Sequence, residues 1–160
     1  MFKLLILCDA TPTLRQVAAE WRAGAGGAIE LWCPADADVA GAAQAAAEMA
    51  ADLKQQPAGS LAARAWVAAC LSIAAGDAPV LILEDAGLSV AILRAAGAAL
   101  ASHEMVLVPA PSGSVALIGL RRAVPELFAG APAGLPAPSL RARARSRGLG
   151  YRELPALAST

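Results

Sequence analysis

The stretch Gly76-Asp77-Ala78-Pro79-Val80-Leu81-Ile82-Leu83-Glu84-Asp85 decides the fold of this chain. Residues 76–79 are typical of a turn, and the uninterrupted apolar run after them is typical of a strand that is buried on both faces. Ser89 then marks the start of a helix that we expect to extend to about Ser102. A buried strand followed closely by a helix indicates a parallel sheet.

The same alternation of strand and helix extends toward the N-terminus. Further strands are predicted at Phe2–Leu7, Ala28–Cys33 and Leu53–Gln56. Helices are expected to begin at Thr11-Pro12, at Asp36 or Asp38, and at Ser60. The sequence therefore predicts an α/β fold in one domain over residues 1–160, with a three-layer, Rossmann-like arrangement: a mostly parallel sheet with helices on both faces.

Two consecutive apolar runs, Met105–Val108 and Val115–Leu120, break the parallel pattern. The loop between them is too short for a crossover helix, so these strands are expected to be antiparallel or to diverge. After a loop rich in Pro and Gly, Ser139 is expected to cap a basic helix over Leu140–Arg147, and Tyr151–Leu154 to form a last strand.

Composition excludes several classes of protein. Hydrophobic residues make up 58% of the 160 residues, but no apolar run approaches the roughly 20 residues that a membrane-spanning helix needs. We therefore expect a cytoplasmic protein without a membrane span. Aromatic residues are only 4%, which argues against nucleic-acid binding by stacking. The single histidine, His103, excludes a three-histidine zinc site and is expected to cap its helix.

Charge is unevenly distributed, although the net charge is +0. Residues 1–104 hold six basic and eleven acidic side chains, and residues 105–160 hold seven basic and two acidic ones. The arginines at 141, 143, 145 and 147 are interpreted either as a phosphate clamp or as a solvated helix face. This polarity and the alanine-rich helices also make a homo-oligomer one expectation.

The first candidate ligand site is the pair Glu84-Asp85, which directly follows the central buried strand. In open α/β sheets, ligands bind beyond the carboxyl ends of the strands. Two carboxylates there are suited to a divalent ion, Mg²⁺ or Mn²⁺, that bridges phosphates. The alternative is that the pair only forms the turn and caps the next helix.

Two further segments are candidates for ligand contacts. The loop Ser112-Gly113-Ser114 could turn backbone N–H groups toward an anion, or it could be only a turn. Cys8 follows the first strand without a basic neighbour, so a structural thiol is favoured over a nucleophile.

Four segments of the chain share the pattern of a known family. They are Gln56-Pro57-Ala58-Gly59-Ser60-Leu61-Ala62-Ala63-Arg64, then Pro79–Asp85 with Leu88-Ser89 and Leu93-Arg94-Ala95-Ala96, then Val106–Leu120, and finally Pro125-Glu126-Leu127-Phe128 with Pro132, Gly134 and Pro136. Together they resemble small bacterial glycosyltransferases with the GT-A nucleotide-diphospho-sugar transferase fold, the group that includes the arsenosugar-biosynthesis type. The most specific segment is Leu117-Ile118-Gly119-Leu120-Arg121-Arg122.

The departures from this family fall on functional positions. Asp85 matches the acidic residue of the metal and diphosphate region, but the Cys-Pro that follows it in the family is Ala86-Gly87 here. The family's Asp-Gly-Gly-Tyr is Ser112-Gly113-Ser114-Val115, and its N-terminal Gly-x-x-Lys-Thr-Arg loop is replaced by Asp9–Thr13.

The resemblance therefore implies a glycosyltransferase-like protein with a degenerate active site that takes a nucleotide sugar. It implies that Asp85, with Glu84, holds the metal and that Ser112-Gly113-Ser114 lies near the sugar. The alternative is a non-catalytic binding, regulatory or dimerising module on the same scaffold. Binding of a diphosphate without the basic loop would require substitutes, for which Arg121, Arg122 or the arginines of residues 141–147 are the candidates.

Overall fold

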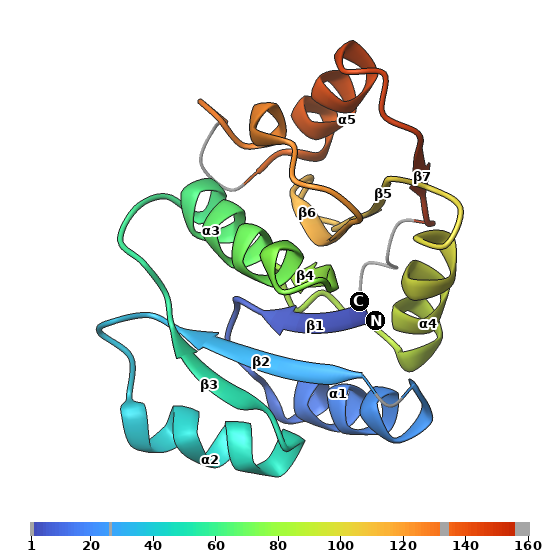
Figure 1. Ribbon diagram of the computed structural model, residues 1–160. Coiled ribbons are helices and arrows are strands. Elements are labelled where there is room, and N and C mark those ends of the chain that lie inside the picture. The colour runs from blue at the N-terminus through green and yellow to red at the C-terminus, as the bar shows by residue number, and fades with distance from the viewer. Residues whose placement is uncertain (1, 26, 132–134, 156–160) are drawn as a thin grey trace.

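The computed structural model describes residues 2–25, 27–131 and 135–155, whose strands form one seven-stranded sheet (Figure 1). The strands are β1 (Phe2–Ile6), β2 (Ala28–Cys33), β3 (Asp52–Gln55), β4 (Ala78–Ile82), β5 (Met105–Pro109), β6 (Val115–Leu120) and β7 (Tyr151–Glu153). The helices are α1 (Pro12–Ala25), α2 (Val39–Met49), α3 (Leu61–Ala74), α4 (Val90–Ala99), α5 (Ala137–Ser146) and the short 3-10 helix η1 (Pro125–Leu127).

The strand order is β3-β2-β1-β4-β6-β5-β7. Strand β6 runs antiparallel to β4 and β5, and the other pairings of the described strands are parallel. Both the mostly parallel sheet and the antiparallel pair of strands are therefore confirmed. The chain moves outward from β1 through β2 to β3 and then returns to β4 on the other side of β1, so the strand order reverses between β1 and β4.

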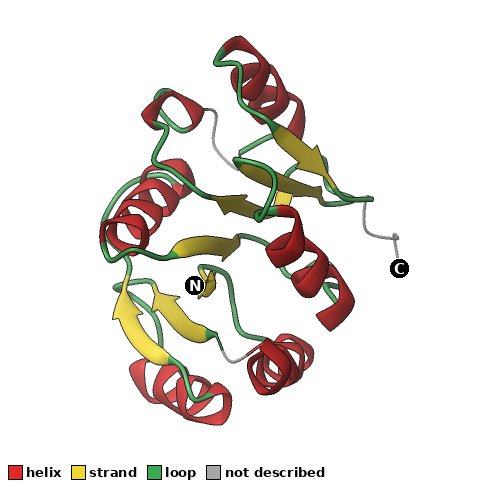
Figure 2. Ribbon diagram, turned by 45° about the vertical axis from the view of Figure 1, so that its right-hand side comes forward, coloured by secondary structure: helices red, strands yellow, loops and turns green. Residues whose placement is uncertain are grey.

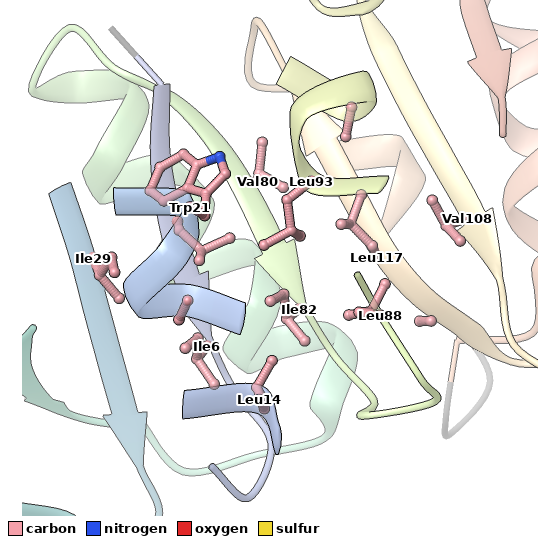
Figure 3. Packing of buried hydrophobic residues seen from close by; sticks show 14 of the residues in the cluster. Ile6, Leu14, Trp21, Ile29, Val80, Ile82, Leu88, Leu93, Val108 and Leu117 are labelled. Atoms are coloured by element: carbon pink, nitrogen blue, oxygen red, sulfur yellow. The ribbon is translucent and has the colours of Figure 1, made fainter. Parts of the chain in front are cut away.

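Helices cover both faces of this sheet and create two cores (Figure 2). Helices α1, α2 and α4 pack on one face, and α3, η1 and α5 pack on the other. Strand β1 serves both cores, because Leu4 and Ile6 face the first and Leu5 faces the second. In the first core, Leu14 of α1 and Leu93 of α4 pack with strand residues (Figure 3). The expected three-layer arrangement is confirmed.

The predicted helix starts are set by local side-chain contacts. The hydroxyl of Ser60 accepts a hydrogen bond from the N–H of Ala63, and the hydroxyl of Ser89 accepts one from Ile92, at 3.2 Å in both cases. Asp38 precedes α2, as expected, although its side chain makes no capping hydrogen bond. These hydrogen bonds confirm the two serine caps. The caps could be predicted because each depends only on residues within one helical turn.

The predicted start of the C-terminal helix is wrong. Helix α5 begins at Ala137, so Ser139 lies inside its first turn and does not cap it. Contacts with a distant loop set the start: Pro136 forms a β-bridge with Ser114, and the N–H of Ala137 donates to the carbonyl of Gly113 (3.0 Å). Pro132 and Gly134, which the family resemblance included, lie outside the described residues.

The three tryptophans take part in packing, and His103 has the capping role that the sequence predicted. Trp21 and Trp32 are buried, and Trp66 packs against the second core. The Nδ1 atom of His103 lies 3.1 Å from the carbonyl oxygen of Ala99 at the end of α4. Across the described ranges, no helix combines the length and the apolarity needed to cross a membrane.

Candidate functional site

Loops that carry polar residues converge at one edge of the sheet. Strands β1 to β4 are parallel, so their carboxyl ends lie together, and the antiparallel β6 contributes its amino end to the same edge. The edge is formed by the loops 7–11, 34–38, 56–60, 83–89 and 110–114. Open α/β sheets bind ligands at such an edge, where the strand order reverses.

Thr11 and Asp85 connect the loops on the two sides of this reversal. The Thr11 hydroxyl accepts a hydrogen bond from the N–H of Leu14 (3.2 Å), which confirms its predicted capping role, and it donates one to the Asp85 carboxylate. Asp85 is half-buried in the loop that follows β4. The structure thus fixes this carboxylate at the centre of the edge.

Glu84 faces the loop that precedes β6. Ser112 Oγ donates a hydrogen bond to Glu84 Oε2 (2.9 Å), so two of the predicted ligand residues are in contact. The N–H of Gly113 donates to the carbonyl of Ala110 (3.0 Å), and the N–H of Ser114 to Ser112 Oγ (3.4 Å). With these N–H groups used inside the turn, the Ser112 hydroxyl is the part of the loop that reaches the acidic pair.

A hollow of about 270 Å³ opens between the loops that follow β1 and β2. Its walls include Asp9 and Ala10 from the first loop, Pro34 from the second, and Asp38 and Gly41 at the start of α2. The hollow therefore lies on the β2 side of the strand reversal, beside the loop that Thr11 joins to Asp85.

Arg15 is a site residue that sequence reasoning missed. It lies in the first turn of α1 and lines the hollow. Its NH1 atom is 3.1 Å from Glu48 Oε2, while its Nε atom is buried with no hydrogen-bond partner among the described residues. The available signal was its position in the first turn after the β1 loop, where a side chain reaches the carboxyl edge.

Acidic side chains act together on the Cys8 thiol at this edge. Burial raises the pKa of Cys8 from 9.0 to about 12, and the charge of Asp85 raises it next, with smaller contributions in the same direction from Asp9 and Glu84. A thiol with this pKa stays protonated at neutral pH, which agrees with the predicted structural role. The three carboxylates place negative charge around this thiol.

The side chain of Gln56 links the chain segments at the carboxyl ends of β1 and β2. Its Nε2 donates to the carbonyl oxygen of Leu7 (3.1 Å), which follows β1, and to that of Trp32 (2.6 Å), the second-last residue of β2. Its Oε1 accepts a hydrogen bond from Arg64. Gln56 is only 4% exposed. The glutamine and arginine of the first family segment therefore hold the two loops of the hollow in place.

Glu84 and Asp85 are the predicted metal ligands. Within residues 2–25, 27–131 and 135–155, no three His, Cys, Asp or Glu side chains are grouped to hold a metal ion by themselves. Magnesium commonly takes one or two carboxylates and completes its coordination with water and phosphate oxygens. In this structure the two carboxylates are hydrogen-bonded to different neighbours, Asp85 to Thr11 and Glu84 to Ser112, so a metal ion here would need further oxygen ligands from water or phosphate.

The arginines predicted to replace the basic loop lie away from the hollow. Arg121 and Arg122 follow β6 at the opposite edge of the sheet, where Arg122 pairs with Glu104 (2.8 Å). Arg141 of α5 pairs with Glu153 of β7, the outermost strand on the other side of the sheet (2.6 Å). Arg15 is the cation that the fold brings to the hollow.

The strand order, with its one antiparallel strand and helices on both faces, defines a GT-A-like fold of the nucleotide-diphospho-sugar transferase type. Residues 14–134 match the family described as "Uncharacterized protein conserved in bacteria (DUF2064)". The chain belongs to this family. A comparison with curated protein sequences gives no significant match.

Solved structures share this fold. A proposed nucleotide-diphospho-sugar transferase from Desulfovibrio desulfuricans G20 aligns with a TM-score of 0.72 and 18% identity, over 97% of this chain and 79% of that one. The protein Rv0371C of Mycobacterium tuberculosis H37Rv, in complex with manganese, aligns with a TM-score of 0.57 and 20% sequence identity, over 96% of this chain and 87% of that one. A CMP:2-keto-3-deoxy-manno-octonic acid synthetase, in complex with CTP, aligns with a TM-score of 0.59 and 9% sequence identity, over 98% of this chain and 89% of that one.

Proposed function

We propose that this protein is glycosyltransferase-like and binds a nucleotide sugar at the carboxyl edge of β1, β2 and β4, with a degenerate active site. The hydrogen bond from Thr11 to Asp85 carries the proposal. It fixes a carboxylate where the strand order reverses, which is the ligand position of open α/β sheets. A carboxylate there supports binding of phosphates through a divalent ion.

The charge of the site supports a metal-dependent mode of binding. Asp85, Asp9 and Glu84 act on the same half-buried thiol, so they would repel a bare diphosphate. A Mg²⁺ or Mn²⁺ ion on Asp85, with Glu84 beside it, would offset this charge and supply a bridge to phosphate oxygens. The manganese complex of the related mycobacterial fold supports the choice of ion.

The hollow beside the β1 loop is the proposed position of the nucleoside. Its volume of about 270 Å³ is at the lower limit of small-molecule pockets, so part of the ligand would lie outside it. The diphosphate would extend toward Asp85, with Arg15 as the cation that replaces the basic loop of the family. The sugar would then meet the loop Ser112-Gly113-Ser114, which contacts Glu84.

Loss of catalysis is the second candidate, and the loop before β6 favours it. In the glycosyltransferase family that the sequence resembles, the residue matching Ser112 is an acid and the residue matching Val115 is a tyrosine. Val115 is 1% exposed and belongs to the second core, so it contacts no ligand. A transferase needs groups that stabilise the leaving diphosphate and accept a proton from the acceptor. A non-catalytic binding or regulatory module requires only the binding edge.

Thermal unfolding of the purified protein tests the binding proposal. Sugars linked to UDP, GDP, ADP, CDP and dTDP would be added with and without Mn²⁺. We expect one nucleotide to raise the Tm only with the metal, because a ligand that binds the folded state stabilises it. Asp85→Asn should abolish the shift, whereas Asp52→Asn, an exposed residue at the far end of β3, should retain it.

Two outcomes separate the candidate functions. Release of nucleoside diphosphate from the stabilising nucleotide sugar, lost in Asp85→Asn, would establish an enzyme. Binding without release would establish the non-catalytic module. If the protein melts cooperatively and no nucleotide sugar shifts its Tm with or without Mn²⁺, the proposed site is wrong.

We also propose a cytoplasmic location. Cys8, Cys33 and Cys70 are half-buried free thiols. A reducing compartment keeps thiols in this state.

A further inference from the structure

Strand β3 leaves one edge of the sheet open. It is the outermost strand on its side, and among the described strands it pairs only with β2 (Figure 1). Its four residues, Asp52-Leu53-Lys54-Gln55, are all exposed. The free N–H and C=O groups of such an edge can pair with a strand of another chain.

The backbone of β3 determines which of its residues can make that pairing. The N–H of Gln56 donates to the carbonyl of Cys33 on β2 (2.8 Å). Because backbone groups of successive residues in a strand point to opposite sides, Lys54 turns its N–H and C=O toward β2, as Gln56 does. Leu53 and Gln55 turn theirs outward, where no strand among the described residues meets them.

Charge and backbone direction together select one register for pairing β3 with itself. Directly opposite residues of an antiparallel pair both point their backbone groups at the partner or both point them away, so one residue of β3 must lie opposite itself. With Asp52 or Lys54 there, like charges oppose each other, which is destabilising. With Gln55 there, Leu53 would meet Pro57, which has no N–H to donate. With Leu53 there, Asp52 of each copy lies opposite Lys54 of the other.

We propose that the free edge of β3 pairs with the same edge of a second copy of this chain, antiparallel about a two-fold axis at Leu53, so that the two sheets join into one. The two Leu53 residues exchange a pair of backbone hydrogen bonds. The N–H of each Gln55 reaches the carbonyl of Ala51 in the other copy. The N–H of Ala51 is already used, because it donates to the carbonyl of Ala46 at the end of α2 (2.8 Å).

Helix α2 lies at the same end of the sheet. Helix α1 contacts both α2 and α4, so α2 is the outermost helix on this face, and it contacts β3. Leu53 is beside Leu31 of the first core and therefore lies on the α2 face. Glu48 of α2 pairs with Arg15 of α1, and Val39, nine residues earlier, lies on the opposite side of a helix with about 3.6 residues per turn. The exposed side of α2 that carries Val39 thus faces the open edge.

The proposed axis also covers this side of α2. A two-fold axis perpendicular to the joined sheet places both α2 helices on the same face, one on each side of the axis. Val39 and Leu53 are 65% and 37% exposed in the single chain. Ala43, one turn after Val39, is exposed and small, which allows the two helices to approach closely. The backbone edge, the two ion pairs and the apolar side of α2 therefore fit the same partner, a second copy.

Sedimentation equilibrium with charge reversals tests the proposal on the complete chain. Wild type should have twice the chain mass of 16.0 kDa. Lys54→Asp places two pairs of carboxylates opposite each other and should raise the dimer dissociation constant at least about tenfold. Adding Asp52→Lys restores opposite charges and should return the constant to within about threefold of wild type. Glu20→Lys, an exposed reversal on α1, should leave the dimer intact, and circular dichroism checks that every variant folds.

Disulfide trapping in a mixture tests the register. Asp52→Cys and Lys54→Cys proteins, mixed and mildly oxidised, should give a covalent dimer, because directly opposite residues that share no hydrogen bonds lie within disulfide range. Either variant alone should give no more covalent dimer than wild type. A monomeric wild type at about 100 µM, a double charge reversal that fails to restore the dimer, or equal trapping in the mixture and in the single variants would each overturn the proposal.

Discussion

The guanidinium of Arg64 donates a hydrogen bond to the side-chain oxygen of Gln56. This bond orients the amide nitrogen of Gln56 toward the carbonyls of Leu7 and Trp32, at the ends of two neighbouring strands. Gln56, in the loop before α3, and Arg64, in the first turn of α3, thus hold the loops that enclose the hollow. We infer that the pair preserves the shape of this edge of the sheet.

Gln56→Leu should therefore destabilise the fold. It removes the donor for two carbonyl groups in a buried setting, and each lost partner costs about 1–3 kcal/mol. We expect the free energy of unfolding in urea to fall by about 2–4 kcal/mol. Gln55→Leu, one residue earlier and exposed on β3, is the matched control and should change it by less than about 0.5 kcal/mol. Equal effects in the two variants would contradict the role of Gln56.

The reactivity of Cys8 should report the charge of the site. Its pKa of about 12 makes the thiolate scarce at pH 8, so alkylation by iodoacetamide should be slow. Asp85→Asn removes a nearby negative charge, which lowers the pKa and should speed alkylation by about three- to tenfold. Mass spectrometry of the Cys8 peptide gives the rate. Asp52→Asn is the control, and an unchanged rate in Asp85→Asn would place that carboxylate away from the thiol.

Glu153 should make stability depend on acid pH. Arg141 donates two hydrogen bonds to its carboxylate (2.7 and 2.6 Å), which lowers the pKa of Glu153 below 4.5 in the folded state. Because the unfolded chain has the higher pKa, the pair stabilises the fold above about pH 4.5, and this contribution is lost as the pH falls through the folded pKa.

Glu153→Gln tests this pH dependence. At pH 7 we expect the variant to be less stable than wild type by up to about 1 kcal/mol, since the pair is partly exposed. The difference should shrink progressively below pH 4.5 in urea unfolding curves. Glu20→Gln, an exposed change on α1, controls for the general effect of lost charge. A difference that stays constant down to pH 3 would exclude the ion pair as its source.

Local sequence signals were sufficient for most of the fold. The serine caps at Ser60 and Ser89 depend on a residue three positions away, and the apolar run that ends at Leu83 is itself the strand signal. The antiparallel β6 could be inferred because a short loop excludes a crossover. These features were predictable because their causes lie within a few residues.

The details of the site depend on contacts that sequence order does not display. Asp85 could be placed at the ligand edge, but its partner Thr11 lies 74 residues earlier. Arg15 was missed because its place in the first turn of α1 indicated only that it lies near the edge, whereas the packing of α1 beside α2 forms the hollow that it lines. The start of α5 was wrong because a bridge to Ser114 fixes Pro136. Long-range pairing decides which polar residues meet.

Gly119, in the most specific family segment, should be required by packing. A Cβ at this position would lie 2.9 Å from Cδ1 of Leu100, which is 1% exposed at the end of α4. Gly119→Ala should cost about 1–3 kcal/mol of unfolding free energy, because the core around it is closely packed. Leu100→Ala alone should cost about 2–5 kcal/mol through the cavity that it leaves. In the double variant the added methyl enters that cavity, so the total loss should be smaller than the sum of the single losses. Urea unfolding of the four proteins measures this coupling, and strictly additive losses would show that Leu100 is not what requires glycine at this position.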